Sequence, residues 1–138
     1  MASWMVHLRI ADEILKRMEG LDETAFVIGN IAPDSGVPNE DWSKYFPPKN
    51  VSHFKTRPDD ELFFDVDEFK KQYFSDEKIK GYDKRHYSFF LGYYVHLLSD
   101  IEWTVNYSAT SNRASCFNHY CVGYDIHNSA SYTVSTGV

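Results

Sequence analysis

The stretch from Ser88 to Trp103, SFFLGYYVHLLSDIEW, constrains the fold more than any other part of the chain. It is apolar on almost every side, and a helix that is apolar all round is buried. It nevertheless carries His96 and Asp100, which at a spacing of i and i+4 lie one above the other on the same helix face. A buried ionised carboxylate is tolerated only when it is paired, hydrogen-bonded or bound to a metal. The pair therefore predicts either a metal site or a His-Asp hydrogen bond that ties the core together. Gly92, one turn earlier on the same face, leaves room for another backbone or a ligand.

Hydrophobic periodicity predicts further helices in the first 103 residues. Asp22 is a typical N-cap, and the acidic run that begins at Asp59 suits the positive end of a helix dipole. The predicted helices cover residues 4–18, 23–30, 59–73 and a central helix from about residue 84. No long alternating segment, typical of a strand, occurs before residue 104. The predicted fold class is therefore all-α, a helical bundle with a metal site between its helices.

Composition excludes several classes of protein. A chain of 138 residues is one domain by length, and its formal charge of -6 argues against stable nucleic-acid binding and against electrostatic capture by an anionic membrane. No segment approaches the length of a transmembrane helix. The N-terminus lacks the pattern of a signal peptide, which predicts a cytoplasmic protein. Cys116 and Cys121 match no metal or redox motif, and the oligomeric state is left open.

The composition changes abruptly after Trp103. Residues 104–138 contain no Lys, Glu, Leu, Pro or Trp, and Arg113 and Asp125 are their only charged residues. A continuing helical bundle needs Lys and Glu on its surface. The tail is predicted to be irregular, either a Ser/Thr/Asn-rich appendage or a non-native segment from a frameshift or fusion junction, and composition favours the second. The predicted domain is residues 1–103.

Three more candidate ligands stand at apolar-flanked positions before the central helix. His7 shares the inward face of the first helix with Ala11, Asp34 follows a proline after the second helix, and His53 ends a Pro-rich loop. Each alone is more typical of a core residue or a turn. With His96 and Asp100 they make three imidazoles and two carboxylates, ligands that zinc prefers and that a core rarely accumulates by accident.

The segment from residue 38 to 58 is long, Pro-rich and aromatic. Long loops in compact domains are more often functional than idle. Trp42, Tyr45 and Phe46 are therefore predicted to wall a substrate pocket and to contact an apolar or base moiety.

The sequence resembles the zinc-dependent phospholipase C family, which shares its all-helical fold with the S1/P1 nucleases. The resemblance covers roughly residues 4–103 and is carried by HLRIADEIL from His7, GNIAPDSG with Asp34, SHF with His53 and FFLGYYVHLLSD, which contains His96 and ends at Asp100. It implies that Asp34, His53, His96 and Asp100 surround one zinc ion, while His7 and a bridging Asp100 reach a second.

Two parts of the family pattern are missing. The family completes its second site with the amine of a processed N-terminal Trp, whereas Trp4 is preceded here by Met-Ala-Ser. The family's third site uses a His soon after the HxxxD pair and then a His-xxx-Glu. Here Asn106 stands six residues beyond Asp100, and His119 and His127 are eight residues apart with no Glu near them. The resemblance therefore implies one or two zinc ions.

Two functions of different classes remain open. The first is zinc-dependent hydrolysis of a phosphodiester or phosphomonoester, with a small phosphate ester or phospholipid head group as substrate and with Asp34 as the catalytic residue that orients or deprotonates the water. The alternative is a non-catalytic helical domain in which Asp34, His53, His96 and Asp100 close a structural zinc site.

Overall fold

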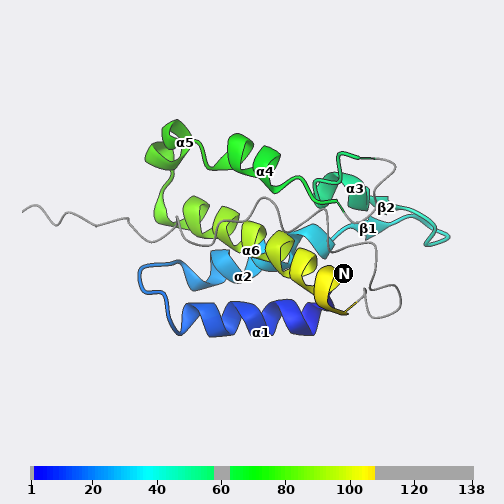
Figure 1. The fold of residues 1–138 in the computed structure, drawn as a ribbon, viewed down its shortest axis with the longest axis horizontal. Helices are drawn as coiled ribbons and strands as arrows, with labels where there is room; N and C mark the ends of the chain where they lie inside the picture. The colour runs from blue at the N-terminus through cyan, green and yellow to red at the C-terminus, as the bar shows by residue number, and fades with distance from the viewer. Residues whose placement is uncertain (1, 58–62, 108–138) are drawn as a thin grey trace, which may run out of the picture.

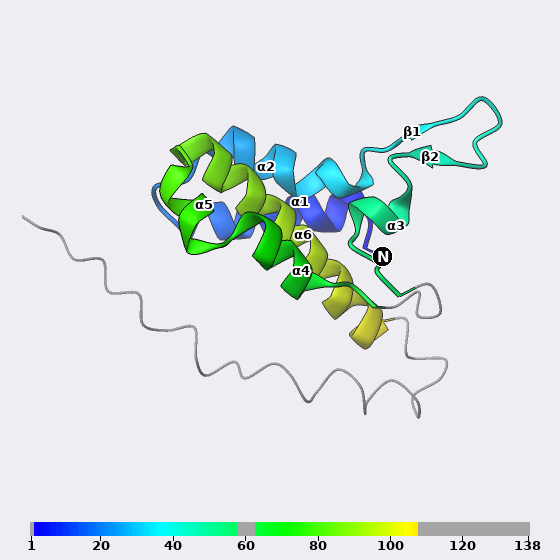
Figure 2. The same ribbon diagram turned by 90° about the horizontal axis from the view of Figure 1, so that it is seen from above.

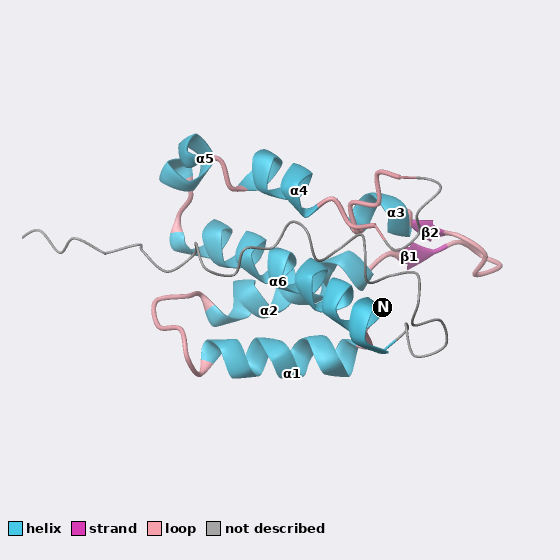
Figure 3. Ribbon diagram, viewed as in Figure 1, coloured by secondary structure: helices cyan, strands magenta, loops and turns pink. Residues whose placement is uncertain are grey.

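The computed structural model describes residues 2–57 and 63–107, which form a helical body with one small hairpin (Figures 1 and 3). The helices are α1 Trp4–Leu15, α2 Glu23–Ile31, the 3-10 helix η1 Ala32–Asp34, α3 Lys49–Ser52, α4 Val66–Tyr73, α5 Asp76–Gly81 and α6 Lys84–Tyr107. Strands β1 Val37–Pro38 and β2 Tyr45–Phe46 pair antiparallel, with Val37 opposite Phe46. The predicted all-α fold class is confirmed.

Helix α6 is the centre of the fold. Helices α1 and α2 lie on one side of it and α4 and α5 on the other (Figure 1). Phe69 of α4 is fully buried and stacks on Tyr93 and Tyr94 of α6, with ring centroids 5.2 and 5.9 Å apart. Such aromatic pairs add specific geometry to the burial of a large apolar area. The buried side of α4 therefore forms the core against α6, together with the buried Leu97.

Two glycines let α2 and α6 touch through their backbones. A Cβ atom added to Gly92 would lie well under 3.0 Å from the Phe26 carbonyl oxygen of α2, and one added to Gly29 would clash equally with the Phe89 carbonyl oxygen of α6. The side chain of Asn30 donates a hydrogen bond to the Gly92 carbonyl at 3.2 Å across this contact. Of the two neighbours predicted for Gly92, another backbone or a ligand, the structure shows the backbone of α2.

Several element boundaries differ from the predicted ones. Helix α4 begins at Val66, because the Asp65 carboxylate accepts the Glu68 N–H as an N-cap and Phe64 packs into the core before it. The predicted start at Asp59 lies outside the described residues. Helix α1 ends at Leu15, ahead of Gly20, whose φ of 85° is left-handed. Helix α5 lies in the polar stretch between α4 and α6, where no helix was predicted.

Helix α6 continues to Tyr107, past the compositional boundary at Trp103. The predicted irregular tail otherwise falls on residues 108–138, which lie outside the described residues, as do Cys116 and Cys121. The domain boundary and the origin of the tail therefore stay predictions, as does the cytoplasmic location.

Among the helices of residues 2–57 and 63–107, none has the length and hydropathy needed to cross a bilayer.

Candidate metal centre

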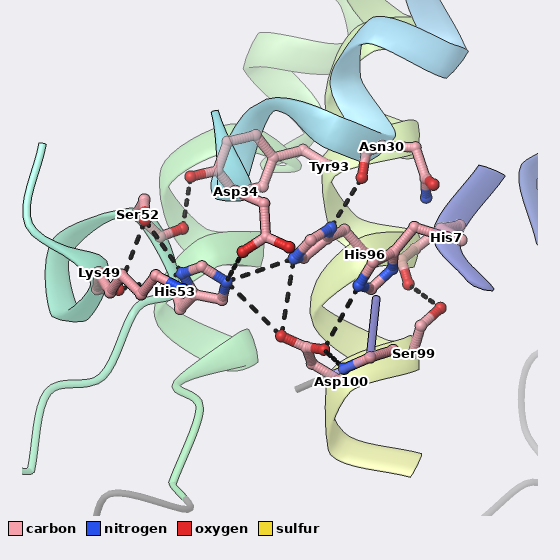
Figure 4. Close-up of polar contacts among 12 residues, drawn as sticks. His7, Asn30, Asp34, Lys49, Ser52, His53, Tyr93, His96, Ser99 and Asp100 are labelled. Carbon is pink, nitrogen blue, oxygen red and sulfur yellow. Dashed lines mark hydrogen bonds and ion pairs between the residues drawn. The ribbon is translucent and has the colours of Figure 1, made fainter. Parts of the chain in front are cut away.

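The five candidate ligands come together beside the second half of α6 (Figure 4). His7 lies on α1 and Asp34 on η1, His53 directly follows α3, and His96 and Asp100 lie on α6. The three histidines and Asp100 are fully buried, and the Asp34 side chain is 9% exposed. Among the five cluster residues, Asp34 is therefore the one at which solvent reaches the site.

Backbone carbonyls orient two of the histidines. His96 Nδ1 lies 2.7 Å from the Asn30 carbonyl oxygen, and His53 Nδ1 lies 3.1 Å from the Lys49 carbonyl oxygen and 3.0 Å from Ser52 Oγ. A carbonyl oxygen can only accept a hydrogen bond, so each Nδ1 carries the proton and donates it. Each Nε2 is then left with a lone pair directed into the cluster, the arrangement found in metal-binding histidines.

Four electron-pair donors converge at the centre of the cluster. His53 Nε2 lies 3.3 Å from His96 Nε2, 3.3 Å from Asp34 Oδ1 and 3.5 Å from Asp100 Oδ2, and His96 Nε2 lies 3.6 Å from Asp100 Oδ2. Neither Asp34 Oδ1 nor Asp100 Oδ2 has a hydrogen-bond partner among the described residues. Lone pairs and carboxylates at these distances repel one another unless a cation lies between them.

These distances fit a zinc ion. Nitrogen and oxygen ligands at about 2.0–2.2 Å from zinc and at tetrahedral angles lie about 3.3–3.6 Å from one another. The four measured separations fall in that range, and two imidazoles with two carboxylates are a donor set that zinc accepts. The residues present therefore fit the metal implied by the sequence.

His7 lies on the far side of Asp100 from His53. Its Nε2 is 3.4 Å from Asp100 Oδ1, and its ring stacks on His96 with centroids 3.8 Å apart. Neither ring nitrogen of His7 has a hydrogen-bond partner in the described structure, whereas Asp100 Oδ1 also accepts the Ala2 backbone N–H at 2.7 Å. His7, His96 and Asp100 thus make a second group able to hold a metal beside Asp34, His53 and His96. Asp100 presents one oxygen to each side, the geometry of a bridging carboxylate.

The family model described as zinc-dependent phospholipase C matches residues 6–120. The chain belongs to this family. The match includes all five candidate ligands and runs beyond the compositional boundary at residue 103. No curated protein and no solved structure matches the chain significantly. The family predicted from the sequence is confirmed, and with it the assignment to a family of zinc-dependent hydrolases.

The protonation of the cluster suits the zinc dependence of the phospholipase C family. Burial, together with the neighbouring His7, lowers the pKa of His96 to about 4, so the His96 imidazole is neutral at pH 7. Burial opposes ionisation of Asp34 and Asp100, but His53 and His96 beside Asp34, and His7 and the Ala2 N–H beside Asp100, outweigh it and lower both pKa values. Neutral imidazoles and ionised carboxylates are the states that bind metal.

Sequence reasoning missed the groups that position the ligands in this family member. The Asn30 carbonyl, the Lys49 carbonyl and the Ala2 N–H are backbone groups, which no side-chain motif reveals. Asn30 also has a fully buried side chain. A buried amide in an apolar helix was the one available signal, since such a group needs an internal partner.

The three aromatic residues predicted to contact substrate lie on the hairpin. Trp42 is 70% and Phe46 79% exposed, and Tyr45 is less so. Tyr45 and Phe46 line a surface hollow of about 690 Å³ together with Lys49, and none of the five cluster residues lines it. The structure thus brings the five candidate ligands together, but the three aromatic residues do not join them. Their role as substrate contacts stays a prediction.

Proposed function

We propose that the protein hydrolyses phosphoric esters with zinc, and that its substrate is a phospholipid head group or a related small phosphodiester or phosphomonoester. One observation carries this proposal above all. Two imidazole lone pairs and two carboxylate oxygens without hydrogen-bond partners face one another at 3.3 to 3.6 Å in a buried site. Membership of the zinc-dependent phospholipase C family supports the choice of metal and of substrate class.

Asp34, His53, His96 and Asp100 would hold one zinc ion, and His7 together with Asp100 would hold a second. Zinc in such a site supplies Lewis acidity, which activates water and polarises a phosphoryl oxygen near neutral pH. The carbonyls of Asn30 and Lys49 hold the imidazoles of His96 and His53 in the tautomer that leaves Nε2 free.

Asp34 is the residue best placed to contact water and substrate, because it alone in the cluster is partly exposed. Its lowered pKa keeps the carboxylate ionised at neutral pH. A carboxylate of low pKa is a weak base, so orientation of the attacking water suits it better than removal of a proton. Asp34 therefore acts as the catalytic residue by holding the water toward the phosphorus atom.

Substitution of Asp34 with Asn tests this role. We expect Asp34→Asn to lower the rate of hydrolysis of p-nitrophenyl phosphorylcholine about 100-fold or more, since the amide cannot hold the water as the carboxylate does. Zinc content and the circular dichroism spectrum are measured on the same samples. Asp67→Asn is the matched control, because Asp67 is an exposed aspartate on α4 whose side chain is 88% accessible. Full activity of Asp34→Asn would contradict the assignment.

The second candidate is a closed, non-catalytic zinc site. The burial of four of the five ligands favours it, since a structural zinc is fully enclosed by protein ligands. Replacement of zinc by Co²⁺ distinguishes the two functions. For a hydrolase we expect inorganic phosphate to change the visible absorption of the Co²⁺ protein, because phosphate enters an open coordination position. A spectrum that phosphate leaves unchanged would favour the structural site.

A further inference from the structure

The hairpin of β1 and β2 extends away from the helical body beyond the end that carries the cluster (Figure 2). Its apolar side chains have no cover within the described chain: Val37 is 68% exposed, Trp42 70% and Phe46 79%, and Val51 of the adjoining α3 is 59% exposed. Val37 and Phe46 are paired across the strands and so share one face of the hairpin. Exposed apolar side chains gathered on one hairpin and the helix beside it are typical of an interaction surface.

Hydrogen bonds order the tip of the hairpin, where the Trp42 side chain is exposed to solvent. Trp42 has a φ of 61°, in the left-handed region that glycine and asparagine adopt far more readily than a bulky residue. The Trp42 N–H bonds the Asn39 carbonyl at 3.1 Å, and the Lys44 N–H bonds Asn39 Oδ1 at 2.9 Å. Asp41 Oδ1 accepts from the N–H and the hydroxyl of Ser43 at 3.0 and 2.6 Å. A large aromatic placed where the backbone disfavours it, and then exposed, indicates a partner outside the chain.

The charges around the patch select the kind of partner. Glu40 and Asp41 at the tip are balanced by Lys44 and Lys49 on the second half of the hairpin and on α3, so the patch carries no net charge. The whole chain has a formal charge of -6. An anionic membrane would repel such a protein, whereas a zwitterionic bilayer would not. Tryptophan is also the residue that favours the interface between head groups and acyl chains.

We propose that the hairpin docks the protein on a zwitterionic phospholipid bilayer by inserting Trp42, Phe46 and Val37 into the interface. The hairpin joins Asp34 at the end of η1 to His53 after α3, so docking would bring the partly exposed edge of the cluster to the membrane surface. The reason for docking rests on the proposed phospholipid hydrolysis, but the contact itself needs no metal. The protein would therefore contact the bilayer through the hairpin, which lies between the candidate ligands Asp34 and His53 in the sequence.

The test measures binding to vesicles separately from catalysis. The full-length protein is sedimented with phosphatidylcholine vesicles in EDTA, so that hydrolysis plays no part. We expect the protein to bind, and Trp42→Asn to lower the partition coefficient at least about tenfold, because burial of one large aromatic side chain exceeds the free energy that corresponds to tenfold. Asn suits the left-handed backbone, so thermal stability should be unchanged. Met18→Gln is the control, since Met18 is 45% exposed and follows the end of α1 that is distant from the hairpin (Figure 1).

Any of the following results would overturn the proposal. The first is a wild-type protein that does not sediment with the vesicles. The second is vesicle binding that the Trp42→Asn substitution leaves intact. Another is binding to phosphatidylglycerol vesicles alone, which salt abolishes in every variant. The last is a dimer in analytical ultracentrifugation that Trp42→Asn dissociates without any vesicle binding, which would make the patch a contact between copies of the chain. Vesicle binding with no hydrolysis in zinc would instead refute the proposed function and leave the docking surface intact.

Discussion

The variant His96→Ala is expected to lose bound zinc almost completely. His96 Nε2 lies 3.3 Å from His53 Nε2 and 3.6 Å from Asp100 Oδ2, so its removal takes a central donor from the site proposed for the first zinc ion. The wild-type chain should carry about one zinc ion or more, since its donor set completes at least one tetrahedral site. Metal analysis by inductively coupled plasma mass spectrometry on dialysed protein measures the difference directly.

Two further variants separate metal binding from folding. His96→Gln fills most of the volume of the imidazole, and circular dichroism of both variants shows whether α6 remains helical. His86→Ala is the matched control, because His86 is an exposed histidine at the start of the same helix that contacts Asp83 and lies outside the cluster. Unchanged zinc content in His96→Ala with an intact fold would refute the metal centre. Equal loss of zinc in His86→Ala would show that the effect is not specific to the cluster.

The largest effect on stability is expected for Gly92→Ala. The added methyl group would collide with the Phe26 carbonyl and with the Asn30 backbone nitrogen of α2, and backbone atoms cannot rotate out of the way as a side chain can. Helix α2 must then move off α6. We expect the free energy of unfolding to fall by about 3 kcal/mol, at the upper end of the range for overpacking. Urea denaturation followed by circular dichroism measures the change.

Gly81→Ala is the control for this variant. Gly81 is the last residue of α5, and a Cβ added there would meet nothing within 4 Å. Alanine has the higher helix propensity, so this substitution should leave stability unchanged or raise it slightly. If Gly92→Ala were as stable as Gly81→Ala, the close contact between α2 and α6 would be wrong.

Much of the helical fold could be predicted because burial leaves a periodic signal. The apolar surround of His96 and Asp100 placed both on one buried face, and their side chains do approach within 3.6 Å there. The N-cap Asp22 was also predicted, and its carboxylate accepts the Ala25 N–H at 2.8 Å. In each case a local pattern and the tertiary structure favour the same conformation.

The start of α4 could not be predicted from local signals. Acidic residues suit a helix N-terminus both at Asp59 and at Asp65, and composition does not choose between them. The choice depends on Phe64, which is 4% exposed in the core and directly precedes the cap. The hairpin was missed because each strand has only two residues, too few to show a period of two.

The clustering of the five candidate ligands could be predicted from the sequence, but the orientation of their side chains could not, and their role as ligands stays a prediction. A resemblance to a family carries residue types and their order, which was enough to select His7, Asp34 and His53 from positions that are individually unremarkable. The nitrogen of His96 that faces the cluster is set by the hydrogen bond from Nδ1 to the Asn30 carbonyl. Asn30 lies near the end of α2, where the chain continues into η1. Contacts of this kind depend on the packing of whole helices.

The backbone contact between α2 and α6 serves both the packing of the fold and the geometry of the candidate site. Gly29 makes room for the Phe89 carbonyl and Gly92 for the Phe26 carbonyl, so a larger residue at one position cannot be compensated by a change at the other. The same contact holds the Asn30 carbonyl within 2.7 Å of His96 Nδ1. A side chain at either glycine would therefore disturb both the packing of α2 on α6 and the orientation of the His96 imidazole.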